Sequence, residues 1–104
     1  MKSKIEERNG TKYLYFQPEG MEVMNLPVIT SGSRSDTNCW SWNGDLEKPT
    51  IKPSVLHVYS KSYEKGEYKE IKIHFWLNDG VCKCLGDCTD GNAGKELQLL
   101  PIEG

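Results

Sequence analysis

Hydrophobic and polar residues alternate on both sides of an Asp79-Gly80 pair, within the stretch from residue 71 to residue 85. An Asp-Gly pair between two alternating runs is the strongest short-range signal for a two-residue β-hairpin turn. In that register Phe75 lies opposite Cys84, and Trp76 lies opposite Lys83. The alternation predicts an apolar face formed by Ile73, Phe75, Leu77, Cys82 and Cys84. The other face, which we expect to be free for binding, carries Lys72, His74, Trp76 and Lys83.

Other alternating or apolar runs predict strands over residues 12–16, 21–26, 39–42, 55–59 and 95–100. Residues 1–11 are polar and are expected to fray, and the charged segment 60–69 is expected to form an exposed arm between two strands. Pro49 and Pro53 favour an extended segment that lies at a sheet edge or over a sheet face. No helical periodicity persists for three turns, so the sequence predicts one all-β domain over residues 1–104. We expect about seven short strands in a small antiparallel sandwich or partly open barrel.

The chain has 104 residues and a formal net charge of −2, which gives no basic footprint for binding duplex nucleic acid. It has no apolar run long enough to cross a membrane, and its first residues lack the apolar stretch of a signal peptide. We therefore expect no membrane partner, a cytosolic location and reduced thiols. Exposed β edges in a small domain favour a homo-oligomer.

The four cysteines have two remaining interpretations once disulfides are set aside. The hairpin register places Cys82 and Cys84 among apolar residues, where they act as packing residues. The alternative is a four-thiolate zinc site formed by Cys39, Cys82, Cys84 and Cys88. We expect the packing role and no cofactor.

A polar loop from Thr30 to Asn38 contains Ser33, Arg34 and Ser35. It is typical of a flexible connection, but it could also bind an anion through backbone N–H groups, hydroxyls and the planar guanidinium. It matches neither a Walker loop nor a dinucleotide fingerprint.

The outward cluster around Trp76 could be a solvated face or a platform on which a nucleobase stacks while cations contact its phosphates. The candidate ligand-binding residues are Ser33, Arg34, Ser35, Trp42, Thr50, Lys72, His74, Trp76, Lys83, Asp87 and Thr89.

The inventory for catalysis is small. His57 and His74 are candidate bases, and Asp87 and Asp90 are candidate acids or orienting groups. Cys88 and Thr89 are candidate nucleophiles. No triad spacing or nucleophile elbow accompanies these residues, so the sequence does not predict an enzyme.

Several short motifs occur in one order: W-S-W-N-G-D at 40–45, P-T-I-K-P-S-V at 49–55, His74, D-G-V at 79–81 and D-C-T at 87–89. From Trp40 to Pro101 the chain thereby resembles a family of small tailed-phage proteins that often carry an "ammonia monooxygenase" label. Members of that family look like metal binders. Most of their ligands are absent here, because residues 24–36 contain no cysteine pair, Ile73 precedes His74, and Asp90 stands where a later histidine would be.

Combined with this resemblance, the outward cluster predicts a phage accessory protein, located in the host cell cytoplasm, that sequesters a small nucleotide-type ligand such as a host immune signal. An alternative is a protein-binding inhibitor of a host defence factor, or a virion accessory that uses an exposed edge. A third hypothesis is a metal-dependent or hydrolytic enzyme.

Overall fold

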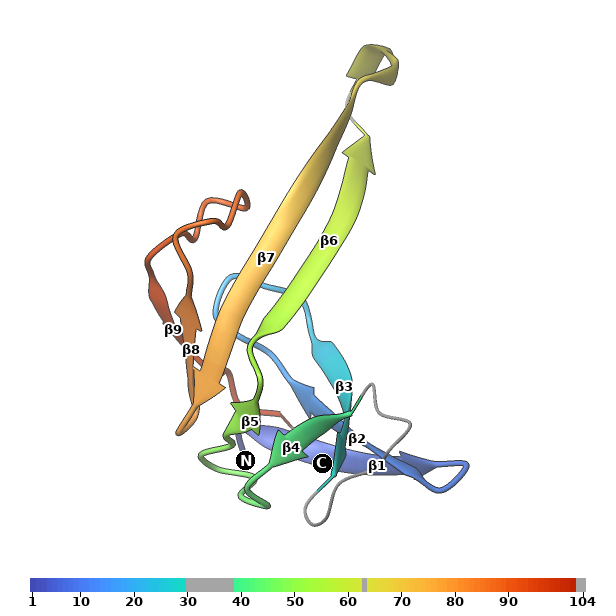
Figure 1. Ribbon diagram of the computed structural model, residues 1–104, viewed down its shortest axis with the longest axis vertical. Helices are drawn as coiled ribbons and strands as arrows, with labels where there is room; N and C mark the ends of the chain where they lie inside the picture. The colour runs from blue at the N-terminus through green and yellow to red at the C-terminus, as the bar shows by residue number, and fades with distance from the viewer. Residues whose placement is uncertain (30–38, 63, 103–104) are drawn as a thin grey trace.

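The computed structural model describes residues 1–29, 39–62 and 64–102 (Figure 1). Within these ranges the chain forms nine strands in two sheets and no α-helix, so the all-β prediction is confirmed with two more strands than expected. The first sheet contains, in order, β1 (Ser3–Arg8), β2 (Thr11–Phe16), β3 (Met24–Ile29), β4 (Trp40–Trp42) and β5 (Ile51–Lys52). The second contains β6 (Val55–Ser62), β7 (Tyr68–Asn78), β8 (Val81–Cys84) and β9 (Glu96–Gln98).

The N-terminal segment is ordered, contrary to the expectation of fraying. β1 pairs with β2 along its whole length, from Ser3 opposite Phe16 to Arg8 opposite Thr11. Asn9 and Gly10, with φ values of 53° and 79°, form the turn between them. Two consecutive positive φ angles suit an Asn-Gly type I′ hairpin, and this signal was present in the sequence.

The central hairpin has the predicted register. Asn78 pairs with Val81, Trp76 with Lys83, and Phe75 with Cys84. Its turn packs against residues 47–50, where Gly80 N–H donates to Pro49 O at 2.9 Å. A Cβ on Gly80 would lie 3.2 Å from the Lys48 Cα atom, so only glycine fits without a shift of the backbone. The hairpin turn is thereby joined to the segment that leads into β5.

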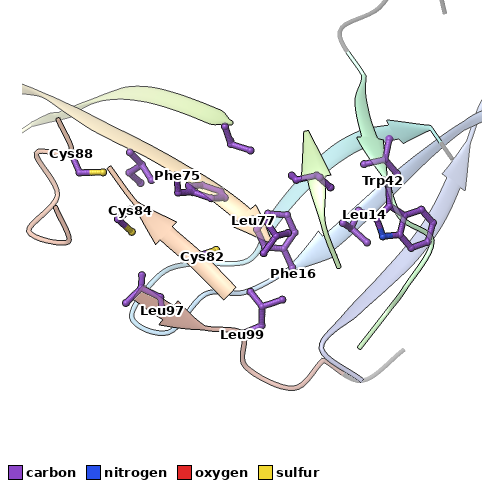
Figure 2. Close-up of a cluster of buried hydrophobic side chains, with 14 residues drawn as sticks. Leu14, Phe16, Trp42, Phe75, Leu77, Cys82, Cys84, Cys88, Leu97 and Leu99 are labelled. Atoms are coloured by element: carbon purple, nitrogen blue, oxygen red, sulfur yellow. The ribbon is translucent and has the colours of Figure 1, made fainter. Parts of the chain in front are cut away.

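One core lies between the two sheets (Figure 2). The Phe16 and Phe75 rings, from β2 and β7, meet edge to face with centroids 6.1 Å apart. Cys82 and Cys84 are buried, as the packing interpretation predicts. Burial raises the pKa of the Cys82 thiol to about 12 and that of the Cys84 thiol to about 11, so both are protonated at neutral pH.

Strands β6 and β7 project as a long pair from the two-sheet body (Figure 1). The expected arm over residues 60–69 is shorter than predicted, because β6 continues to Ser62 and β7 begins at Tyr68. A short 3-10 turn, η1 (Glu64–Gly66), lies at the tip. In the described ranges, no helix is long and apolar enough to span a membrane.

Candidate active site

Ser54 lies where the chain passes from the first sheet to the second, between β5 and β6. Pro49 precedes β5, and Pro53 follows β5 directly, immediately before Ser54. The Trp40 indole Nε1–H donates to Ser54 O at 3.4 Å, which fixes the main chain beside the serine. The Ser54 side chain is partly exposed and therefore accessible to a substrate.

His74 extends from the outward face of β7, next to this serine. The distance from Ser54 Oγ to His74 Nε2 is 3.1 Å, a hydrogen bond. Leu85 N–H donates to His74 O at 2.8 Å, and the Cys88 thiol contacts His74 N at 3.3 Å and His74 O at 3.1 Å. The main chain of the histidine is therefore held by the segment that follows β8.

Asp87 completes the arrangement from that same segment. Its carboxylate oxygens Oδ2 and Oδ1 lie 3.0 Å and 3.2 Å from His74 Nδ1. Thr89 anchors the segment to β7, since Thr89 N–H donates to Lys72 O at 2.9 Å and Thr89 Oγ1 accepts from Lys72 N–H at 2.8 Å. The hydrogen bond from His74 lowers the pKa of Asp87, and the Lys72 ammonium, 3.9 Å from Oδ2, lowers it further.

These distances define a serine–histidine–carboxylate relay. A carboxylate at Nδ1 fixes the imidazole tautomer that carries its proton on Nδ1, which leaves Nε2 free to accept the proton of the serine hydroxyl. The three groups follow one another along the chain as Ser54, His74 and Asp87. Such triads are recognised by geometry and roles, because unrelated folds place the three groups in different sequence orders.

Several predicted ligand-binding residues gather around this relay. His74 and Asp87 belong to it, Lys72 adjoins the carboxylate, and Trp76 lies exposed two residues along β7 from the histidine. Lys83, opposite Trp76, lies 3.8 Å from Glu96 in an exposed ion pair. The outward face predicted from the alternation thus exists, and it carries the triad histidine.

Other predicted residues have structural roles. Trp42 is buried in the core and its Nε1–H donates to Asp45 O at 3.3 Å, so it offers no surface for stacking. Thr50 Oγ1 accepts from Asp79 N–H at 2.7 Å and thereby holds the hairpin turn. Thr89 anchors its loop as described above. Ser33, Arg34 and Ser35, with the anion loop from Thr30 to Asn38, lie outside the described residues.

The remaining candidate catalytic groups do not join the relay. The thiol of Cys88 is buried against the His74 main chain, and His57 stacks beside Tyr59 with ring centroids 5.5 Å apart. Asp90 Oδ1 accepts from Asn92 N–H at 3.1 Å, closing a local turn. For the alternative zinc set, no group of three or more possible ligands occurs among the residues that the structure describes.

Ser54 was missing from the predicted site. The sequence offered one signal for it, a serine directly after a proline and before the apolar run Val55–Tyr59. What brings it to the histidine is the pairing of β6 with β7, in which Leu56 lies opposite His74. Ser54, two residues before Leu56, is on the same side of the strand and therefore becomes a diagonal neighbour of the histidine.

A family model described as BubE, a bacterial ubiquitination-like system serine protease, matches residues 4–85. The match includes Ser54 and His74 and ends two residues before Asp87. No curated protein and no solved structure matches the chain.

This match overturns the resemblance to the tailed-phage "ammonia monooxygenase" proteins. The predictions that rested on it, a phage accessory protein that sequesters a nucleotide against host defence, are wrong. The expectation that the chain is not an enzyme is also wrong, because the matching family is one of serine proteases. Of the three hypotheses drawn from the sequence, the hydrolytic enzyme fits best. The family model spans most of the chain, and its description as a serine protease agrees with the hydrogen bond between Ser54 and His74. The chain belongs to the BubE family of bacterial ubiquitination-like system serine proteases.

Proposed function

We propose that this protein is a serine protease in which Ser54 is the nucleophile, His74 the general base and Asp87 the group that orients the histidine. The observation that carries the proposal is the continuous hydrogen-bonded relay, 3.1 Å from Ser54 Oγ to His74 Nε2 and 3.0 Å from His74 Nδ1 to Asp87 Oδ2. Membership of a serine protease family supports it independently.

In the acylation step Ser54 Oγ attacks the scissile carbonyl carbon while its proton passes to His74 Nε2. The tetrahedral intermediate collapses as the C–N bond breaks, and His74 gives the same proton to the leaving amine. Water then attacks the ester carbonyl, again losing a proton to His74, and Ser54 recovers that proton as the new carboxyl group leaves. The enzyme ends each cycle unchanged.

Asp87 remains ionised throughout this cycle because its pKa is lowered. Its negative charge stabilises the imidazolium that forms each time His74 holds a proton on both nitrogens. Lys72 contacts the same carboxylate oxygen as the histidine, while Cys88 holds the His74 main chain and Thr89 holds that of Lys72. Each of these residues acts by positioning rather than by touching the substrate.

The proposal is tested with a fluorophosphonate probe, which reacts preferentially with activated serine hydroxyls. The wild-type protein should become labelled at Ser54, as located by peptide mass spectrometry. Ser54→Ala should abolish labelling, and His74→Ala should slow it by about 10³-fold or more.

Ser41→Ala serves as the matched control, because Ser41 is an exposed strand serine with no part in the relay. It should label at the wild-type rate. Absence of labelling in the folded wild-type protein, or equal labelling of wild type and His74→Ala, contradicts the proposed function.

A further inference from the structure

The strand that begins beside the nucleophile has an open edge. β6 is the terminal strand of its sheet among the described residues, with β7 on one side only. A sheet edge presents unpaired N–H and C=O groups to which another extended chain can add.

The pairing of β7 tells which groups of β6 face outward. The main-chain groups of Lys72 and His74 bond to Thr89, Leu85 and Cys88, on the side away from β6. The main-chain N–H and C=O groups of neighbouring residues in a strand point to opposite sides. The groups of β7 that form hydrogen bonds with β6 are therefore those of Ile71, Ile73 and Phe75. Their partners across the pair are Tyr59, His57 and Val55.

The groups that remain on the outer edge of β6 are therefore the N–H and C=O of Leu56, Val58 and Ser60. The contact at Ser54 agrees with this assignment, since Ser54 O already bonds outward to the Trp40 indole. In the described part of the chain no main-chain partner for these three residues is found beyond β7. The first open N–H is two residues from the nucleophile.

Apolar side chains accompany this edge on both faces. Leu56 and Val58, 55% and 43% exposed, share the face of their cross-strand neighbours His74 and Lys72. The opposite face of β6, which carries His57 and Tyr59, borders a cleft of about 720 Å³. The apolar residues Met21, Met24, Leu26 and Trp40 also line this cleft.

We propose that the open edge of β6 binds the substrate as an added strand, so that the preferred substrate is an extended, unpaired polypeptide segment. This inference rests on the proposed function, because it assumes that Ser54 is the nucleophile. Pairing with Leu56 and Val58 places successive substrate side chains alternately over the triad face and into the cleft. A folded surface cannot pair in this way, whereas a tail or unfolded loop can.

The test separates the edge from the triad with two substrates. Reduced, alkylated casein is an unfolded polypeptide that can pair along β6, and p-nitrophenyl acetate is an ester too small to reach the edge. Leu56→Pro removes an outward N–H while leaving the bonds to β7 intact, since those belong to residues 55, 57 and 59. We expect kcat/KM for casein to fall at least about tenfold more than kcat/KM for p-nitrophenyl acetate, because only casein uses the edge. Leu56→Ala keeps the N–H and should retain more casein cleavage than the proline variant.

The Leu56→Pro variant could fold poorly, which a lower thermal midpoint would show. A second measurement therefore uses the wild-type enzyme and changes the substrate instead. A peptide spanning a casein cleavage site, identified by mass spectrometry, is synthesised with single backbone N-methyl groups on the residues before the cut. N-methylation at every second residue should lower kcat/KM by at least about tenfold, because those N–H groups would face β6. N-methylation at the residues between them should have little effect. A uniform response to N-methylation overturns the proposal.

The remaining outcomes are distinguishable. No Ser54-dependent ester hydrolysis or fluorophosphonate labelling means that the proposed function has failed. Ester hydrolysis without cleavage of casein, or with casein cleavage unchanged in Leu56→Pro, overturns the edge proposal alone. The wild-type protein could also sediment as a dimer that Leu56→Pro converts to a monomer with casein cleavage retained. That result would identify the occupant of the edge as a second copy of the chain, and it would overturn the edge proposal.

Discussion

The two faces of β7 differ in almost every property although they belong to the same eleven residues. The inner face, with Ile73, Phe75 and Leu77, is buried and joins the sheets. The outer face carries His74 and Trp76, which are partly or substantially exposed. Period-two alternation separates them, so a change on one face should affect stability and a change on the other should affect chemistry.

The largest expected effect is on the outer face. His74→Ala removes the general base, and kcat for ester hydrolysis should fall about 10⁴- to 10⁶-fold, as in other triads. The thermal midpoint should fall only slightly, because the side chain is outside the core and the variant loses only its hydrogen bonds to Ser54 and Asp87. Steady-state kinetics and a melting curve on the same sample measure both. A variant that melts much earlier would place His74 with the structural residues.

Phe75→Ala, one residue along, is the counterpart on the inner face. Phe75 is fully buried and stacks edge to face on Phe16. Removing the ring should lower the free energy of unfolding by about 3–5 kcal/mol, through lost burial and the cavity left behind. Denaturant titration measures this value. Retention of wild-type stability would mean that the two sheets do not share the core shown in Figure 2.

Asp87→Asn tests how much the carboxylate beside His74 contributes to catalysis and to stability. We expect kcat to fall about 10²- to 10³-fold, less than for the histidine, because Asp87 is half exposed and water can partly replace it.

The Asp87→Asn variant should also be less stable at neutral pH. Since the pKa of Asp87 is lowered on folding, its stabilising effect is present above the ordinary carboxyl pKa and disappears as the pH falls through the lowered value. The stability difference between wild type and variant should therefore close in acid, which unfolding curves at pH 7 and pH 3 can show.

The buried thiols of Cys82 and Cys84, on β8, should be unreactive towards alkylating reagents. With pKa values of about 12 and 11, Cys82 and Cys84 should react with iodoacetamide at pH 8 about a hundredfold or more slower than in the unfolded chain. Because the unfolded thiols ionise near pH 9, the raised values also predict that stability declines as the pH rises from 9 towards 11. Mass spectrometry of labelled peptides locates the modified residues. Rapid labelling of Cys82 in the folded protein would contradict its burial.

The smallest effect is expected at Trp76, which is large but 43% exposed. Trp76→Ala should change the free energy of unfolding by no more than about 0.5–1 kcal/mol, as for other surface substitutions. Hydrolysis of p-nitrophenyl acetate should be nearly unaffected. A loss of several kcal/mol in a denaturant titration would assign Trp76 to the core instead.

The central hairpin could be predicted from sequence because every signal for it is local. Asp79 and Gly80 adopt the positive φ values that their turn requires, and the alternation on either side leaves one register that buries the apolar residues. The same kind of signal, Asn9-Gly10, marked the first hairpin. Composition led to the expectation of a frayed end there, but β1 gains the backbone bonds of β2 and buries Ser3.

The candidate site could be predicted only in part. His74, Asp87 and Lys72 were singled out by their chemistry and by the outward face of one strand. Ser54 was not, because its distance from the histidine depends on two long-range pairings: β6 with β7, and the hairpin turn with residues 49 and 50. Residues such as Trp42 and Thr50 were candidates for binding until the fold showed that they hold the core and the turn.

The sequence by itself determined the strand class, the hairpin turns and which side of β7 would be buried, because these follow from local backbone preferences and period-two alternation. The tertiary structure alone decided that a serine after a proline, a strand histidine and a loop aspartate form one relay. Each of the three lies on a different segment, and a hydrogen bond between side chains requires their atoms to meet within about 3 Å. Only the packed arrangement of both sheets imposes that distance.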